Sequence, residues 1–329
     1  MINRRRLIKL SAASVFVPSI IIGSGALAQS SWPNRHLRIV IPFPPGGGAD
    51  IIARLVAHKM SETLGQQVIV ESKSGAGGNV ASEHVARSEP DGYTMFLAGD
   101  HLATSHFINP KVPFHPVRDF EPISLIVKYP IIMAVPANSP DKTLADFIAR
   151  AQKDPGKLTY GSPGAGAVPH LSGELLVHHA KLKMVNVQYR GAAPGIQDLI
   201  PGRIDSFWNN IAPLLPLAKD NQLRMLAVTT AKRSALAPDV RSISEDVPSY
   251  GDVTGWYALF VPGKTPKDVI AKLSAAAAAA TNDPTTKKRL EDQAMIAVGS
   301  TNEELRAFHQ ADMDKWGPVI KAAGLEQKS

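Results

Sequence analysis

The hydrophobic pattern of the chain alternates between short apolar runs and amphipathic stretches. After a polar lead, apolar runs at 37–42, 67–71 and 93–98 predict strands, and helical spacing predicts helices at 51–64 and 79–88 between them. A β-α-β-α-β order favours a parallel sheet with right-handed crossovers. Ligands of such sheets bind at the carboxyl ends of the strands.

The same alternation returns after a β-rich segment at 123–136, in which Lys128-Tyr129-Pro130 separates two runs. Further strands are predicted at 158–160, 185–189, 204–208 and 225–229, and further helices at 144–153, 169–181, 193–201 and 213–221. Two similar α/β halves indicate two lobes, each a mostly parallel sheet flanked by helices, with a ligand cleft between them.

The C-terminal part adds a strand at 256–262 and then three helices, at 266–281, 284–294 and 302–323. These helices have no sheet of their own, so we expect them to pack back on the first lobe. Ala275 to Ala280 predict a plain, closely packed helix, because alanine has the highest helix propensity. The expected division of the chain is lobe 1 at 29–125 and 252–329, and lobe 2 at 126–251.

The N-terminus has the features of an export signal at 1–28. Arg4-Arg5-Arg6-Leu7-Ile8-Lys9 precedes an apolar stretch that is too short to span a membrane, and Ala26-Leu27-Ala28 supplies a cleavage site. The paired arginines resemble a twin-arginine signal, and general secretion is the alternative route. We therefore expect the mature protein in the periplasm.

The mature chain is only mildly basic. Four positive charges and no acidic residue leave with the signal, so the formal charge falls from +7 to +3. This weakens a nucleic-acid role, which favours a basic stripe with interleaved aromatic residues. The chain contains no cysteine, which excludes disulfides, thiolate metal sites and cysteine nucleophiles.

The segment from Pro42 to Asp50, PFPPGGGAD, joins the first predicted strand to the first predicted helix. Glycines allow a close backbone approach, and free N–H groups at a helix N-terminus favour an anion. The loop lacks the Gly-Lys-Ser/Thr ending of a P-loop and the G-x-G-x-x-G of a dinucleotide site, so a carboxylate fits better than a nucleotide. We expect Asp50 to cap the helix. The alternative is a tight turn without a ligand.

Three further glycine loops join predicted strands to predicted helices. They are Gly75 to Asn79, Gly161 to His170 and Gly191 to Pro194. Each alone is compatible with a structural turn. Together, at the strand ends of two lobes, they favour an anion cleft lined by backbone.

Catalysis is the competing class of function. The sequence has neither a G-x-S-x-G elbow nor an H-E-x-x-H metal motif, so we predict no catalytic residue, metal or cofactor. Asp100 and His101 follow the third strand and are the best-placed acid and base, although their position favours a polar cleft rim over catalysis. Asn209-Asn210 offers amides that could orient a ligand or satisfy a local turn.

The chain resembles the substrate-binding proteins of tripartite tricarboxylate transporters, the Bug receptors, over nearly its whole mature length. The resemblance rests on the order and spacing of several motifs, namely IPFPPGG at 41–47 with Asp50, GAGGN at 75–79, PDGYT at 90–94, GS at 161–162 with Gly164, Gly166 and His170-Leu171, YRG at 189–191, and LAVT at 226–229 ahead of Lys232-Arg233. It implies a type II-like periplasmic receptor that closes around a carboxylated solute and delivers it to a membrane permease.

The resemblance also implies the residues that hold the carboxylate, mainly through backbone N–H groups and bridging waters. The implied positions are Pro45, Gly46, Gly47 and Ala49 in one lobe and Ser162, Ala165, Gly166, Ala167 and Ala192 in the other. The family commonly has an aspartate at Asn209, where it can pair with a ligand amine. Asn209 therefore favours a ligand without an ammonium group, an aliphatic or aromatic mono- or dicarboxylate, and we expect Asp100 and His101 beside it.

The expected partners are this carboxylate and the permease, with no nucleic acid and with the protein acting as a monomer. A ligand sensor for a membrane kinase and a periplasmic enzyme are the alternative functions.

Overall fold

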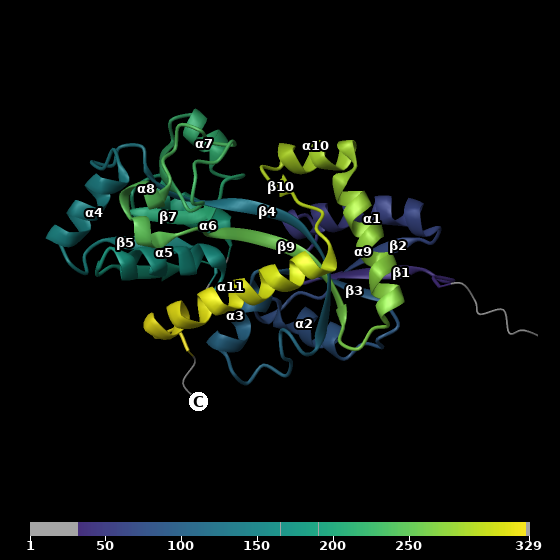
Figure 1. Ribbon diagram of the computed structural model, residues 1–329. Helices are drawn as coiled ribbons and strands as arrows, with labels where there is room; N and C mark the ends of the chain where they lie inside the picture. Colours follow the sequence, from purple (N-terminus) through teal and green to yellow (C-terminus); the bar gives the residue numbers. More distant parts are fainter. Residues whose placement is uncertain (1–31, 165, 190, 327–329) are drawn as a thin grey trace, which may run out of the picture. The chain divides into compact units, whose positions relative to one another are not determined.

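The computed structural model describes residues 32–164, 166–189 and 191–326. The export signal expected at 1–28 lies outside the described residues. Strands and helices alternate along the chain as the hydrophobic pattern predicts (Figure 1). The strands of the first sheet are β1 (Leu37–Ile41), β2 (Val68–Ser72), β3 (Thr94–Gly99), β9 (Thr254–Pro262) and β10 (Ile296–Ala297). Those of the second are β5 (Thr159–Ser162), β6 (Val185–Gln188), β7 (Ser206–Asn210) and β8 (Leu223–Val228), and β4 (Phe120–Pro136) belongs to both.

Both sheets are mixed. β1 is parallel to β2 and β3, and β5 is parallel to β6 and β7, as the β-α-β order predicts. The prediction of mostly parallel sheets needs correction, because β9 runs antiparallel to both β3 and β4, and β4 runs antiparallel to β7 and β8. The strand order is β2-β1-β3-β9-β4-β7-β5-β6.

A single long strand, β4, replaces the two runs predicted at 123–136. Its first part pairs with β9 as far as Pro130, which lies opposite Thr254, and from Ile131 onward it pairs with β7. Proline has no N–H to donate to a sheet ladder. Pro130 therefore marks a change of partner strand and not the end of a strand.

The helices lie over the sheets and at their ends. They are α1 (Gly48–Leu64), α2 (Asn79–Ala86), α3 (His101–Ile108), α4 (Leu144–Lys153), α5 (Val168–His179), α6 (Ala192–Leu199), α7 (Leu215–Lys219), α8 (Ile243–Asp246), α9 (Lys267–Asn282), α10 (Pro284–Asp292) and α11 (Asn302–Ala322). The pattern did not predict α3, because His101 to Ser105 are all buried and a helix without an exposed face has no amphipathic period. No helix within the described ranges is long and apolar enough to cross a membrane.

The C-terminal helices pack back on the first sheet, as predicted. α9 lies against α1 and β4, and α11 lies against α3 and β4 and also reaches α5 (Figure 1). Ala276, Ala277 and Ala280 are buried in α9, which confirms a closely packed alanine helix. In α11 the buried Asp312 accepts a hydrogen bond of 2.9 Å from the indole N–H of Trp256 in β9.

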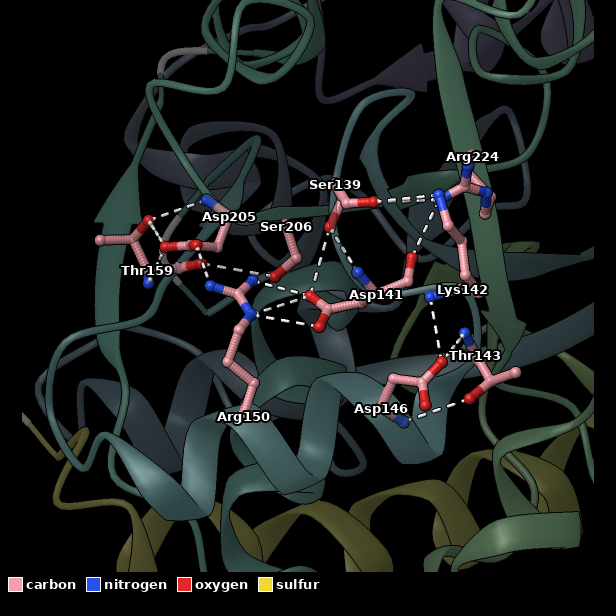
Figure 2. A network of polar contacts seen from close by, with 10 residues as sticks. All are labelled: Ser139, Asp141, Lys142, Thr143, Asp146, Arg150, Thr159, Asp205, Ser206 and Arg224. Carbon is pink, nitrogen blue, oxygen red and sulfur yellow. Dashed lines mark hydrogen bonds and ion pairs between the residues drawn. The ribbon is translucent and has the colours of Figure 1, made fainter.

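A polar network fixes α4 to the second sheet (Figure 2). Arg150 forms ion pairs of 2.7 Å with Asp141 and 2.8 Å with Asp205. Asp205 in turn accepts hydrogen bonds from the backbone N–H and the hydroxyl of Thr159, where β5 begins. One guanidinium thus connects α4, the segment before it and the strand ends of the second sheet.

Candidate functional site

Two adjoining cavities lie where the glycine loops of the two sheets meet. Their volumes are about 320 Å³ and 460 Å³, and they share Phe43, Asp100, Pro163 and Ala167 as lining residues. A larger hollow of about 680 Å³ lies away from these loops. Its arginines, Arg35, Arg38 and Arg87, are each paired with a carboxylate, so it is a poorer anion site.

Three helix N-termini converge on the 320 Å³ cavity. The N-cap residues of α1, α5 and α6 are Gly47, Ala167 and Gly191; all three line the cavity, and none makes a side-chain capping hydrogen bond. An uncapped N-terminus directs N–H groups and roughly half a positive charge at its ligand. Glycine and alanine at these caps therefore leave the backbone to bind an anion.

The first glycine loop is held by Asp50, but not in the predicted way. The helix begins at Gly48 with Gly47 as its N-cap, so the prediction of Asp50 as the capping residue is wrong. The Asp50 carboxylate instead accepts a hydrogen bond of 3.0 Å from the Gly46 N–H and pairs with Arg54 at 2.9 Å. The hydrogen bond with Arg54 is the main cause that lowers the pKa of Asp50.

The glycine loop at 161–170 is closely packed against α3. Gly166 has a φ of +76°, and a Cβ there would lie 2.2 Å from Cδ1 of Ile108. Its N–H donates a hydrogen bond of 2.9 Å to Nδ1 of His170, and its carbonyl oxygen accepts one of 3.3 Å from the Thr104 hydroxyl. His170 therefore supports the loop.

Asp100 and His101 lie on the walls of these cavities. Burial raises the pKa of Asp100 to about 7, and the charge of Asp312 adds to this effect. Tyr129 lies next to Asp100, with Oη 3.3 Å from Oδ2. Burial lowers the pKa of His101 to about 4, so its imidazole is neutral at physiological pH. The cavity walls thus contain a carboxyl group that titrates near neutrality and no protonated histidine at this position.

The amides at the end of β7 face the smaller cavity. Asn209 is 3% exposed, and neither its Nδ2 nor Oδ1 of Asn210 has a hydrogen-bond partner among the described residues. A buried amide without a partner is costly, so an unmet donor beside a cavity indicates a place for a ligand atom or a water. Trp208 and Trp256 are buried core residues.

Only some of the residues predicted for the site line the two cavities. The 320 Å³ cavity is lined by Gly47, Ala49, Asp100, Ala167 and Asn209. The 460 Å³ cavity is lined by Asp100, His101, Gly166 and Ala167. Pro45, Gly46 and Ala192 line neither cavity, and the Gly46 N–H is engaged by Asp50. Ser162 lines neither cavity; it is buried, and its hydroxyl donates a hydrogen bond of 3.1 Å to Oε1 of Gln188. Ala165 lies outside the described residues.

Two tyrosines of this site were not predicted from the sequence. Tyr129 of β4 and Tyr257 of β9 line the smaller cavity, with ring centroids 5.7 Å apart. Tyr257 lies in the strand predicted at 256–262, where core packing is the ordinary role, and Tyr129 lies in the segment that was expected to separate two strands. Within the described ranges, no group of three or more His, Asp or Glu residues could hold a metal ion.

Comparison with known proteins identifies the family of the chain. The family model for the tripartite tricarboxylate transporter family receptor matches residues 52–325. A Rhodopseudomonas palustris protein solved with adipate is 31% identical, with a TM-score of 0.79 over 89% of this chain and 98% of that one. MatC of the same species, with bound malate, is 28% identical, with a TM-score of 0.76 over 88% and 99% of the two chains.

A third structure, the periplasmic binding protein BugD, is 29% identical, with a TM-score of 0.78 over 90% of this chain and all of that one. The chain therefore belongs to the tripartite tricarboxylate transporter receptor family, a family of periplasmic solute-binding proteins.

Proposed function

We propose that this protein is an extracytoplasmic receptor for a small aliphatic or aromatic mono- or dicarboxylate, which it delivers to a tripartite membrane permease. The observation that carries the proposal is the convergence of three uncapped helix N-termini, at Gly47, Ala167 and Gly191, on one cavity. The adipate and malate bound by similar proteins support the same ligand class.

The protein acts as two lobes that close on the ligand, lobe 1 at 29–125 and 252–329 and lobe 2 at 126–251. The pairing of β4 supports this division, since it changes from β9 to β7 between Pro130 and Ile131. The cavity lies between loops of the two sheets, so binding there favours the closed arrangement. The 1–28 segment acts as the export signal and is removed in the periplasm; a mature N-terminus at Gln29, read by mass spectrometry, tests this.

A thermal-shift screen against adipate, malate, citrate, benzoate and glutamate tests the function. A ligand at about 100 times its dissociation constant stabilises its receptor by about 2.7 kcal/mol. We expect a shift with at least one of adipate, malate and benzoate. A shift with glutamate or citrate alone, or with none of the five, contradicts the proposal.

A second experiment distinguishes a receptor from an enzyme. After prolonged incubation with a bound acid, a receptor returns the acid intact, which nuclear magnetic resonance of the supernatant can follow. Steady conversion of the acid into a product would place the protein in the enzyme class.

A further inference from the structure

Asp100 is an unexpected residue in a cavity built for anions. Its side chain is buried and lines both cavities, yet no lysine or arginine is among the described residues that line them. His101, beside it, stays neutral because burial lowers its pKa to about 4. A bound carboxylate would therefore meet a carboxyl side chain with no cationic side chain from these lining residues between them.

The surroundings of Asp100 hold it near the balance between its two protonation states. Burial raises its pKa to about 7, with Asp312 of α11 acting in the same direction. Hydrogen bonds from Tyr129 of β4 and from the backbones of Val168 and His101 oppose this shift. Tyr257 of β9 is a further titratable neighbour; burial and the charge of Asp100 raise its pKa, and it stays neutral.

A ligand carboxylate that binds beside Asp100 would interact strongly with the side-chain carboxylate. At about 4 Å and an effective dielectric constant of about 20, two like charges repel by about 4 kcal/mol. Such a pair shares one proton in preference to carrying two charges. A group already close to neutral needs little free energy to take up that proton.

We propose that Asp100 determines ligand selectivity by carrying a proton in the bound state and donating a hydrogen bond to the carboxylate of the ligand. The proton comes from solvent, so each binding event takes up one proton when Asp100 is ionised beforehand. This inference rests on the proposed function, since it requires a carboxylate ligand. If the protein instead binds glutamate in preference to the acids without an amine, Asp100 is ionised and pairs with the ligand ammonium, which contradicts this inference.

The pH dependence of binding follows from linkage. Below the pKa of free Asp100, the proton is present before binding and affinity is independent of its titration. Above about pH 7 the dissociation constant should rise about tenfold per pH unit, until the pKa of the complex is reached. The member of the screened panel that binds most tightly is titrated by calorimetry from about pH 6 to about pH 9.

The variant Asp100→Asn keeps the shape of the side chain, and its amide N–H can donate a hydrogen bond at any pH without first taking up a proton. We expect it to bind the same acid at about pH 6 within about threefold of the wild type, to lose the pH dependence and to bind more tightly than the wild type at about pH 9. Glu62→Gln, on an exposed face of α1, is the control and should keep the wild-type profile. Loss of binding by a folded Asp100→Asn at every pH overturns the inference.

A measurement on the wild type covers the case in which the variant does not fold. Calorimetry at about pH 8, in buffers of different ionisation enthalpy, should show close to one proton taken up per acid bound. No uptake overturns the inference while leaving the proposed function standing. Absence of binding by all five acids at every pH overturns the proposed function and this inference with it.

Discussion

The hydroxyl of Thr104 donates a hydrogen bond of 3.3 Å to the carbonyl oxygen of Gly166, 62 residues further along the chain. This contact joins α3, which follows the third strand of the first sheet, to the glycine loop that begins α5 beside the second sheet. The loop is thereby held over the cavity by a helix that the hydrophobic pattern did not predict. Changes at this contact should affect both stability and binding.

Replacing Gly166 tests the close packing of the loop. Its φ of +76° opposes a side chain, and so does Cδ1 of Ile108, which would lie 2.2 Å from an added Cβ. We expect Gly166→Ala to lower the free energy of unfolding by about 1–3 kcal/mol and to weaken carboxylate binding. Gly164→Ala in the same loop is the control, because its Cβ would meet nothing within 4 Å. Urea unfolding and calorimetry measure both effects, and equal effects of the two variants would refute the role of close packing.

The unpartnered amide of Asn209 should contribute directly to binding. Its Nδ2 is buried and has no partner among the described residues, and Asn209 lines the cavity, so a ligand carboxylate can accept its hydrogen bond. We expect Asn209→Ala to weaken binding about threefold to tenfold, and Asn209→Asp to weaken it further by adding a negative charge. Asn210→Ala is the matched amide control, since the atom of Asn210 without a partner is an acceptor. Calorimetry should rank the losses in this order; a greater loss at Asn210 than at Asn209 would assign the role to the wrong amide.

The buried His309 should make the protein sensitive to acid. It lies against Trp256 and Phe260, and burial lowers its pKa to about 4 from a usual value of 6.5. Between these two values the unfolded chain binds the proton and the folded chain does not, so stability falls as the pH is lowered through this window. The loss from this residue is on the order of 3 kcal/mol when complete.

The variant His309→Gln should remove that part of the loss. Urea unfolding at about pH 7 and about pH 4.5 measures the difference, and Asp100 titrates in both proteins and cancels in the comparison. His58→Gln is the control, because that side chain is 75% exposed. An unchanged acid sensitivity in His309→Gln would show that this histidine is protonated in the folded protein.

The network around Arg150 should support stability without affecting ligand affinity. Arg150→Ala would leave the carboxylate of Asp141, which is 3% exposed, without its cation. We expect a loss of about 3–5 kcal/mol in the free energy of unfolding. Arg203→Ala breaks an exposed pair with Asp198 and should cost less than about 1 kcal/mol. If the two variants lost equal stability, the network in Figure 2 would be a surface feature without special weight.

Much of the fold could be predicted from the sequence because its elements have clear periods. α4 was predicted with the observed bounds from its apolar spacing, and in the structure a Thr143 capping box fixes its start. α3 could not be predicted, because its buried residues have no polar face. The direction of β9 also escaped prediction, because hydrophobic pattern records which residues are buried and not which strand lies beside them.

The site divides in the same way. The sequence by itself determined the glycine loops, the absence of a nucleotide motif and the family, and it led to the expectation of a carboxylate ligand, because glycine positions and their order are local properties. The tertiary structure decided that Gly47, Ala167 and Gly191 share one cavity, and it placed Tyr129, Tyr257 and Asp100 beside them. Burial and neighbouring charge set the protonation of Asp100, and both depend on elements that meet only when the chain folds.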